Sequence, residues 1–562
     1  MSLLNIGVSA LTTTQASLAT TSHNISNVNT EGYSRQRVDQ VTYTPNFQGT
    51  HYIGSGVTVG GVERIFNEFL ATQVRTYTSQ ESQQDTFLTF ASQVDDLMGS
   101  ENLGLNSGME SFFNAVHEVS NDPTSISARQ VLLTEAELLA NRFNTLDQQL
   151  EGFDKQVDNL LSTAVKDVNT LSRGIAELNE AIIAGTSSSG AVPNDLMDRR
   201  DQLINELSKY LSVSTLPEDS GAINVFVGTG QALVVGTSQI DLHEIVDTST
   251  NPNRISIGYG SSQADISAQL TGGSIGGAFQ VRADVIDASR TELDSLALGI
   301  ATNMNTQHQR GLTLDGTVGG EFFSIPTLPT TVDAGNISLA LSDPRDIAVA
   351  FPMGVTNSSA STGTAQIDIA SIDTTTFPIT LPYSAPITLT FNNATNQYTV
   401  TRGADSNTFA YNPAVDSGAT IDLATVTAAW AAPVEMSLTV SGVPGNGDVT
   451  TLSASAAIGD NRNALAMADL QTAKLLNAGT QSFADSYGVL VANVATRTHQ
   501  ADVGQQTQQG LLDQVELRYE STSGVNLDEE AANLIRYQQA YQAASQIITV
   551  SNTIFNALIN AI

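Results

Sequence analysis

MSLLNIGVSALTTTQASLATTSHNISNVNT (residues 1–30) contains no Asp, Glu, Lys or Arg, and neither does YQQAYQAASQIITVSNTIFNALINAI (537–562). The first such residue in the chain is Glu31 and the last is Arg536. A solvated surface helix normally has an apolar face and a charged face. Helices without a charged face are therefore expected to pack closely on several neighbours at once.

Both ends also carry apolar residues at intervals of seven, which makes a narrow stripe along a helix, as in a coiled coil. The stripe residues are Leu4, Leu11, Leu18 and Ile25 at one end, and Leu527, Leu534, Tyr541, Ile548, Phe555 and Ile562 at the other. Alone, so narrow a stripe buries too little surface to offset the entropy lost on ordering. We therefore predict a subunit interface at these residues, with both ends poorly ordered in the monomer and folding on assembly.

Pairing of the two ends inside one chain is an alternative that explains the stripe equally well. The outer face of such a pair would still be exposed to solvent and would be expected to carry charged residues. Intramolecular pairing therefore does not explain why both ends lack charged residues. The start of the C-terminal helix is marked by Asn526, which stands three residues before Glu529 at a capping-box spacing. Acidic residues at 528–530 would then occupy the first turn, where the helix dipole favours them.

Composition limits the kinds of partner. The chain has 562 residues with 57 acidic and 23 basic side chains, and its net charge of −34 disfavours nucleic acid and anionic membranes. It has no cysteine, so disulfides and thiolate chemistry are excluded. No apolar run approaches the roughly 18 residues of a membrane span, and the N-terminus lacks the basic region of a secretory signal. Export from the cell would need another route.

Helical and strand-like patterns alternate between the two ends. Apolar residues spaced 4,3,4,3 predict a helical rod over 132–182, in which Gly152, Gly174 and an irregular step near Ala164 suggest slight sliding against neighbours. Shorter helices are expected over 87–98, 194–210, 276–309 and 464–475, and a loop over 186–190.

Strand signals occupy the other segments. Short glycine-rich runs over 33–62 predict a hairpin or an extended segment, and period-two alternation makes 211–272 β-rich. Residues 312–455 are a second β-rich stretch, in which one hairpin is legible from Ile387–Phe391 through a polar turn to Tyr398–Thr401.

The expected fold class is α+β and multidomain, with a long α-helical coiled coil or bundle formed by both termini and β-rich domains inserted between them. The expected segments are an N-terminal assembly helix at 1–35, a helical rod with a short β segment at 36–210, a β-rich domain at 211–273, an exposed β-rich insertion at 311–455, and a C-terminal assembly helix at 524–562. The first and last segments are expected to pair, and the rod is expected to continue in 274–310 and 456–523.

No catalytic constellation is recognisable. The six histidines form no HExxH or HxH pair, and the chain has no Walker A sequence and no GxSxG elbow. Asp195, Asp198, Arg199, Arg200 and Asp201 have helical spacing with arginines interleaved, which favours a solvated ion-pair network over a catalytic carboxylate pair. We expect no enzyme activity, no catalytic residue, no metal and no cofactor.

Both ends resemble signatures of one family, the bacterial flagellar axial proteins, which include rod, hook and hook-associated proteins. The N-terminal motif is carried by Asn24, Ile25, Ser26, Asn27, Asn29, Thr30, Gly32 and Tyr33, and its C-terminal counterpart is 523–559. Gly54–Val57 followed by Arg64, Leu196–Asp201 and Gly459–Ala466 resemble the junction-forming, hook-associated members. The resemblance does not extend to 325–455.

This resemblance implies a structural subunit of the extracellular flagellum, placed at the hook–filament junction, exported by the flagellar type III system and assembled through its terminal helices. It implies a homo-oligomer in a ring or helical layer that contacts the hook protein and hook-associated protein 3, and a cytoplasmic export chaperone at the C-terminus. It implies neither nucleic-acid binding nor membrane insertion. The alternatives are the hook protein or another axial protein and, from a different class, an exported adhesin or surface enzyme built on the β modules.

Overall fold

The computed structural model describes residues 3–48, 51–101, 103–189, 191–248, 253–262, 264–325, 333–372, 385–431, 433–434, 436–454 and 459–560. Contacts between residues divide the chain into two compact units. Unit 1 contains Met1–Asp95, Glu151–Asp287 and Val494–Ile562, and unit 2 contains Asp96–Leu150 and Ala288–Asn493. The helices α2 (Glu68–Met98), α4 (Ile126–Ser189) and α10 (Phe483–Ser523) have residues in both units.

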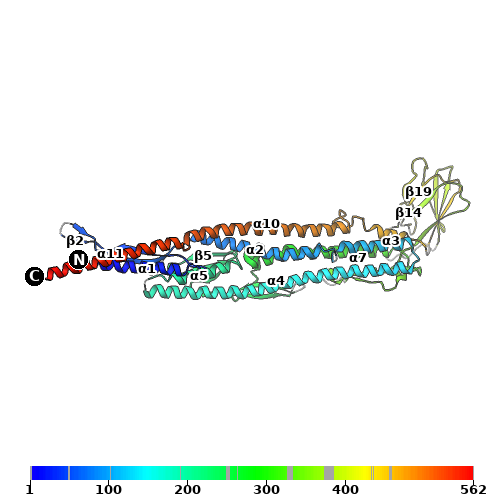
Figure 1. The fold of residues 1–562 in the computed structure, drawn as a ribbon. Helices are drawn as coiled ribbons and strands as arrows, with labels where there is room; N and C mark the ends of the chain where they lie inside the picture. Colours follow the sequence, from blue (N-terminus) through cyan, green and yellow to red (C-terminus); the bar gives the residue numbers. More distant parts are fainter. Residues whose placement is uncertain are drawn as a thin grey trace. The chain divides into compact units, whose positions relative to one another are not determined.

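Unit 1 brings the two ends of the chain together. The helices α1 (Leu3–Ser26) and α11 (Leu527–Asn560) lie side by side, blue against red in Figure 1. The antiparallel strands β1 (Gln36–Thr42) and β4 (Val57–Arg64) pack on α1, and the short strands β2 (Asn46–Gln48) and β3 (His51–Ile53) pair between them in the sequence. The hairpin predicted over 33–62 is therefore confirmed.

The rest of unit 1 includes part of α4, a shorter helix and two groups of strands. Helix α5 (Asn194–Ser208) confirms the helix predicted at 194–210. An antiparallel sheet follows, with β5 (Val213–Pro217), β6 (Ile223–Val227), β7 (Gln231–Val235) and β8 (Ser238–Gln239) in chain order. The strands β9 (Leu242–Asp247) and β10 (Arg254–Tyr259) form a separate pair, and a 3-10 turn at Ser267–Gln269 leads into α6 (Gly273–Val281).

A π-helical turn, Arg282–Asp287, follows α6 directly and is tied to α4 by ion pairs. Arg282 Nε lies 2.7 Å from Asp154 Oδ1, and Arg282 also pairs with Asp158. Arg254 Nε lies 2.8 Å from Asp154 Oδ2 and also pairs with Asp287. Asp154 is buried, and its carboxylate lies between the guanidinium groups of Arg282 and Arg254. The opposite charges therefore compensate one another where the π-helical turn meets α4.

Unit 2 has a helical part in which aromatic side chains pack. Its own helices are α3 (Leu105–Asn121), α7 (Ala288–His308) and α9 (Arg462–Asp469), and β11 (Phe323–Ser324) pairs with β12 (Ser338–Leu339) near 3-10 turns at Ala334–Asn336 and Pro344–Asp346. Phe112 contacts Phe322 and Phe323 with ring centroids 6.0 and 5.7 Å away.

The β module of unit 2 consists of two antiparallel sheets with one apolar core that includes Leu389, Val400 and Leu438. The larger sheet is ordered β13 (Met353–Asn357), β20 (Val449–Ala454), β15 (Ile387–Asn392), β16 (Gln397–Arg402) and β17 (Asp405–Ala410). The smaller is ordered β14 (Gln366–Ile372), β19 (Met436–Ser441) and β18 (Ala419–Asp422), and the short helix α8 (Leu423–Val426) follows β18. Leu389 pairs with Val400 in the β15–β16 ladder, which confirms the predicted hairpin.

The fold class expected from the sequence is confirmed, and two local predictions are wrong. The segment 186–189 is the last turn of α4 and not a loop, because a helix extends at little cost where no proline stands before Pro193. The helix predicted over 464–475 ends at Asp469 and turns follow, with Asn477 and Ala478 at positive φ. Helix α4 runs unbroken through Gly174, where a Cβ would lie 2.9 Å from Leu203 Cδ1, so this glycine serves close packing.

Candidate functional site

The face that α1 buries within the chain is small and polar. Its buried residues are Gly7, Thr13, Thr14, Ser17, Thr21 and Asn24. Hydroxyl groups on this face donate to the helix's own carbonyls, as Thr13 Oγ1 does to Ser9 O at 2.9 Å and Thr14 Oγ1 to Ala10 O at 2.7 Å. Because these hydroxyls are satisfied locally, the face can pack closely without an unpaired polar group.

Gly7 permits a close approach between the terminal helices. A Cβ atom at this position would lie 2.9 Å from Cγ1 of Ile548 and 3.2 Å from Cγ2 of Ile547. The intramolecular pairing of the two ends, left open by the sequence, is therefore present in the structure.

The predicted interface residues fall into two groups. Leu4, Leu11, Leu18, Ile25, Leu534 and Ile548 are half-buried, whereas Leu527, Tyr541 and Phe555 are exposed. Ile562 lies outside the described residues. Within one chain, the stripe is therefore only partly covered.

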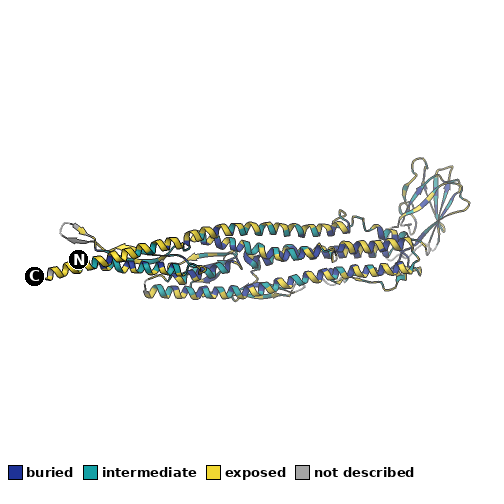
Figure 2. Ribbon diagram, in the orientation of Figure 1, coloured by how far each residue is buried: buried dark blue, intermediate teal, exposed yellow. Residues whose placement is uncertain are grey.

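Four further apolar side chains of α11 are exposed and were missed by the seven-residue repeat: Ile535, Val550, Ile554 and Ile559. Along the described part of α11 only Glu530 and Ala544 are buried, and Figure 2 shows the helix largely in the colour of exposed residues. The signal that could have found Val550, Ile554 and Ile559 is the absence of charge after Arg536, which leaves every face of that part of the helix uncharged.

A polar joint holds α11 to the segment that follows α1. Arg35 Nε donates to Glu530 Oε1 at 2.7 Å, Arg35 Nη1 donates to Glu529 Oε2 at 2.7 Å, and the Arg35 backbone N–H donates to Ser523 O at 2.9 Å. Asn526 Oδ1 accepts from the backbone N–H of Asp528 and Glu529, which confirms the predicted helix cap. The Glu529 carboxylate bonds Arg35 and so connects the cap to the N-terminal segment.

The family motif supplies the other half of this joint. Asn24 Nδ2 donates to Gln36 O at 2.9 Å and to Glu530 Oε2 at 3.2 Å, while Asn24 Oδ1 accepts from Tyr33 Oη at 2.8 Å and from Gln36 N at 3.0 Å. Buried Asn24 thus uses both ends of its amide. Gly32 has a φ of +78°, a conformation that glycine adopts without strain, and it lets the chain turn back toward Asn24.

The remaining motif residues shape the end of α1. Ser26 Oγ donates to Ser22 O, and Thr30 Oγ1 donates to Asn27 Oδ1. Ile25 is half-buried and Asn29 is exposed. The motif therefore builds a defined turn between α1 and β1.

The charged cluster on α5 is not the solvated network that the sequence predicted. Asp198 and Asp201 are 6% and 8% exposed, and both accept from Arg64 Nη1, at 3.0 and 2.6 Å. Asp195 Oδ1 accepts from Gln36 Nε2 at 2.7 Å. Asp198 and Asp201 are buried because Ser34 and Arg64 cover them with matching donors, whereas Asp195 remains exposed.

The two arginines of that cluster have different surroundings. Arg199 is exposed, whereas buried Arg200 donates to Asn179 Oδ1 at 3.0 Å and to Gly221 O at 2.8 Å. A solvated ion-pair face therefore does not describe this site, which fastens α5 to its neighbours.

Electrostatics at the joint follow from burial and neighbouring carboxylates. Burial opposes the charge on Arg35, but the carboxylates of Glu529 and Glu530 outweigh it and raise the pKa of the guanidinium. Burial, followed by the negative charges of nearby carboxylates, raises the pKa of Tyr33 above its usual value. Burial also raises the pKa of Asp198 despite its bonds to Ser34 and Arg64.

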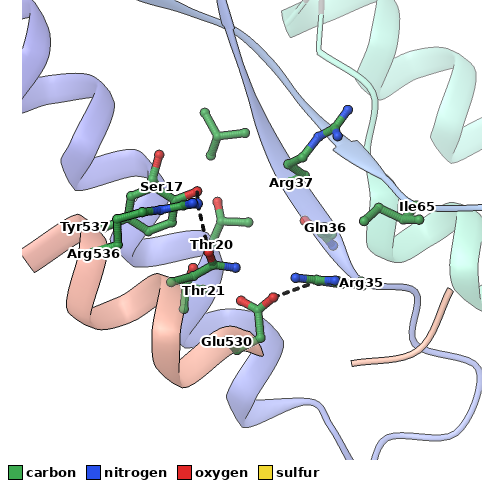
Figure 3. A pocket seen from close by; sticks show the side chains of 12 residues that line it. Ser17, Thr20, Thr21, Arg35, Gln36, Arg37, Ile65, Glu530, Arg536 and Tyr537 are labelled. Carbon is green, nitrogen blue, oxygen red and sulfur yellow. Dashed lines mark hydrogen bonds and ion pairs between the residues drawn. The ribbon is translucent and has the colours of Figure 1, made fainter. Parts of the chain in front are cut away.

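A cavity of about 220 Å³ lies beside the joint, between α1, β1 and α11. Figure 3 shows Arg35 and Glu530 pointing toward one another at its edge, with Ser17 and Thr21 on the α1 side and Tyr537 on the α11 side. The lining is mostly hydroxyl, amide and guanidinium groups.

Within the described ranges, no group of three or more His, Cys, Asp or Glu side chains is placed to hold a metal ion. None of the helices in the described part of the chain has the length and hydropathy to cross a membrane.

Three family descriptions match the chain. The flagella basal body rod protein family matches residues 4–33, the flagellar hook-associated protein FlgK helical domain matches 91–323, and the flagellar basal body rod FlgEFG protein C-terminal family matches 518–561. The first and last of these matches contain α1 and α11, the helices that meet at the joint.

Similarity to known proteins extends over the whole chain. Flagellar hook-associated protein 1 of Salmonella typhimurium strain LT2 is 32% identical over 582 aligned residues, which cover 100% of this chain and 99% of that protein. The protein of the same name from Bacillus subtilis strain 168 is 26% identical, covering 98% and 96%. A solved structure of the flagellar hook junction protein FlgK from Burkholderia pseudomallei has the same fold, with a TM-score of 0.70 at 23% identity over 80% of this chain and 100% of that one. The chain belongs to the flagellar hook-associated protein 1 family.

Proposed function

We propose that this protein is a non-catalytic structural subunit at the junction between the flagellar hook and filament, exported by the flagellar type III system and assembled through its terminal helices. The observation that carries the proposal is the exposure of large apolar side chains on a helix end that has no charge. Ile554, Phe555 and Ile559 are 54%, 61% and 54% exposed in the isolated chain. Aliphatic and aromatic surface gathered in this way marks an interaction site.

Contacts with identical copies suit these ends best. An uncharged helix can approach its own copies closely, whereas like charges would repel one another. The half-buried and exposed stripe residues Leu4, Leu11, Leu18, Ile25, Leu527, Leu534, Tyr541, Ile548 and Phe555 would form the interface in a ring or helical layer. The segments at 1–35 and 524–562 would act as assembly helices, while the rod and the two β-rich domains expected between them would remain outside the contact.

The proposed neighbours are the hook protein on one side and hook-associated protein 3 on the other. This assignment is supported by membership of the family and by the name of the Burkholderia relative, a hook junction protein. A cytoplasmic chaperone would bind the C-terminal end before export and cover its apolar side chains. Poor order of both ends in the free monomer stays a prediction from the sequence.

Truncation of residues 537–562 tests the proposal. We expect the shortened protein to fold in its central part, to bind the chaperone more weakly and to fail in assembly. Cells in which the truncated chain replaces the full-length one should carry hooks without filaments and release filament protein into the medium. A finer variant, Phe555→Asp, should have the same effect, and Val415→Asp in the β module is its control, since Val415 is 78% exposed but far in sequence from the ends. Normal filaments with either terminal variant would contradict the proposal.

A further inference from the structure

A second, larger hollow of unit 1 shares only Leu527 with the residues of the proposed assembly interface. It is a groove of about 1340 Å³ bounded by the turn at 28–33, by α2, α5 and α10, and by the first turn of α11. Small-molecule pockets usually measure about 300–1,000 Å³. The groove is therefore large enough for a peptide segment.

Carboxylates surround the groove. The acidic residues in its lining are Glu31, Glu81, Glu206, Glu516, Glu520, Asp528 and Glu529, whereas the basic ones are Arg35 and Lys209. Arg35 is already engaged by Glu529 and Glu530. Burial, together with the charges of Asp513 and Glu520, raises the pKa of Glu516, as expected where negative charges crowd.

Two leucines give the groove apolar contact points. Leu517 on α10 is 68% exposed and Leu527 on α11 is 51% exposed, and both belong to its lining. Val74 and Leu512 also line the groove, and they belong to a small buried cluster against which Tyr519 packs. An occupant can therefore gain both apolar burial and charge neutralisation.

Polar atoms in the lining lack partners. Ser523 is 1% exposed, and its Oγ has no hydrogen-bond partner among the described residues. Asn205 is half-buried, and its buried Oδ1 also has no partner there. Buried polar atoms are seldom left unpaired, because each one costs desolvation energy without return. Both atoms can accept a hydrogen bond, so an occupant rich in N–H donors would satisfy them.

We propose that this groove binds a basic peptide segment of a partner protein, with Lys or Arg side chains on its carboxylates and an apolar side chain on Leu517 and Leu527. The ends of a second copy are poor occupants, because residues 1–30 and 537–562 carry no lysine or arginine to neutralise these carboxylates. The site shares Leu527 with the proposed assembly interface but does not include Ile554, Phe555 or Ile559.

Fluorescence anisotropy with a short labelled peptide of alternating lysine and leucine tests the site on the full chain. The double variant E516Q/E520Q should weaken binding about five- to tenfold, since each charge contact contributes a modest amount. Leu517→Ser should weaken it about threefold through lost apolar contact. An equivalent peptide of alternating glutamate and leucine should not bind.

The control must separate the groove from the general attraction of an acidic protein for cations. The variant E110Q/E118Q removes two exposed carboxylates from α3 in unit 2 and should leave the affinity unchanged. Equal weakening by both double variants, or no effect of E516Q/E520Q, would overturn the proposal. So would a loss of self-association in E516Q/E520Q without a change in peptide binding, since the occupant would then be a second copy.

Discussion

Arg35 and Glu530 meet across 495 positions of sequence, with Nε 2.7 Å from Oε1, and the glutamate side chain is only 2% exposed. Buried carboxylates are stable only when paired, and Arg35 is the cation that Glu530 contacts. This guanidinium group, together with the Asn24 amide that also bonds Glu530, therefore holds the start of α11 to the segment after α1.

Arg35→Ala should lower the free energy of unfolding by about 2–4 kcal/mol, because it leaves Glu530 buried without a counter-ion. The loss should be local, with faster amide hydrogen exchange over 527–534 than in α5. Arg37→Ala is the matched control, since Arg37 lies two residues away and is exposed. Equal exchange in both variants would show that the ion pair does not hold α11.

Gly7→Ala should destabilise the α1–α11 pair by about 1 kcal/mol, since the new methyl group would crowd Ile548 at the 2.9 Å approach. Gly510→Ala is the opposite case, because nothing lies within 4 Å of a Cβ there and the residue is exposed within α10. It should stabilise the protein by about 0.5–1 kcal/mol through helix propensity. Urea unfolding measures both changes, and the same sign for both would contradict this assignment.

Asp294→Asn should stabilise the protein at pH 7–8. Burial, with further contributions from Asp333 and Asp147, raises the pKa of Asp294 to about 6. A folded-state pKa above the unfolded one means that the folded state loses stability as pH rises from about 4 through 6. After allowance for solvent screening of this half-buried group, we expect a gain of about 1 kcal/mol at pH 7.5 and none at pH 3.5. Glu292→Gln, an exposed neighbour on α7, should show no such pH dependence.

His308 should make the fold sensitive to acid. Its Nδ1 lies 2.8 Å from Gly320 O and its Nε2 accepts from the Ala348 N–H at 2.8 Å, so the ring is neutral. Burial, and then the charge of Arg129, lower the pKa of His308 to about 4. Since this is below the unfolded value, stability is full above about pH 6.5 and decreases as pH falls toward 4, by about 3 kcal/mol in total.

His308→Gln is the variant that isolates this effect. It should be less stable than the wild type at pH 7 but should lose less stability between pH 6.5 and 4, as followed by urea unfolding. An unchanged pH slope in His308→Gln would assign the acid sensitivity to other groups.

Local patterns were predictable from the sequence, and long-range pairings were not. Asn526 was recognisable as a cap and Ile387–Phe391 as a strand, because each depends on residues a few positions away. The burial of Asp198 was not recognisable, since its partner Arg64 lies 134 positions earlier. The same holds for Glu529, whose carboxylate had an obvious local use in the capping box but bonds Arg35.

The terminal helices illustrate the other limit. A repeat of seven selects one stripe on a helix, so it found Phe555 but missed Ile554 and Ile559, which are exposed beside it. Period analysis assumes one apolar face. For a helix segment without charged residues on any face, the composition and not the period indicates that all faces can make contacts.

The hydroxyl-rich seam of α1 reverses the usual order of a helix pair, with threonine and serine inside and much of the aliphatic surface outside. Such a pair buries little aliphatic surface, so the hydrophobic effect stabilises it only weakly. Each additional helix that joins removes hydrocarbon from water, so we expect growth to remain downhill until the last open edge has closed on the first.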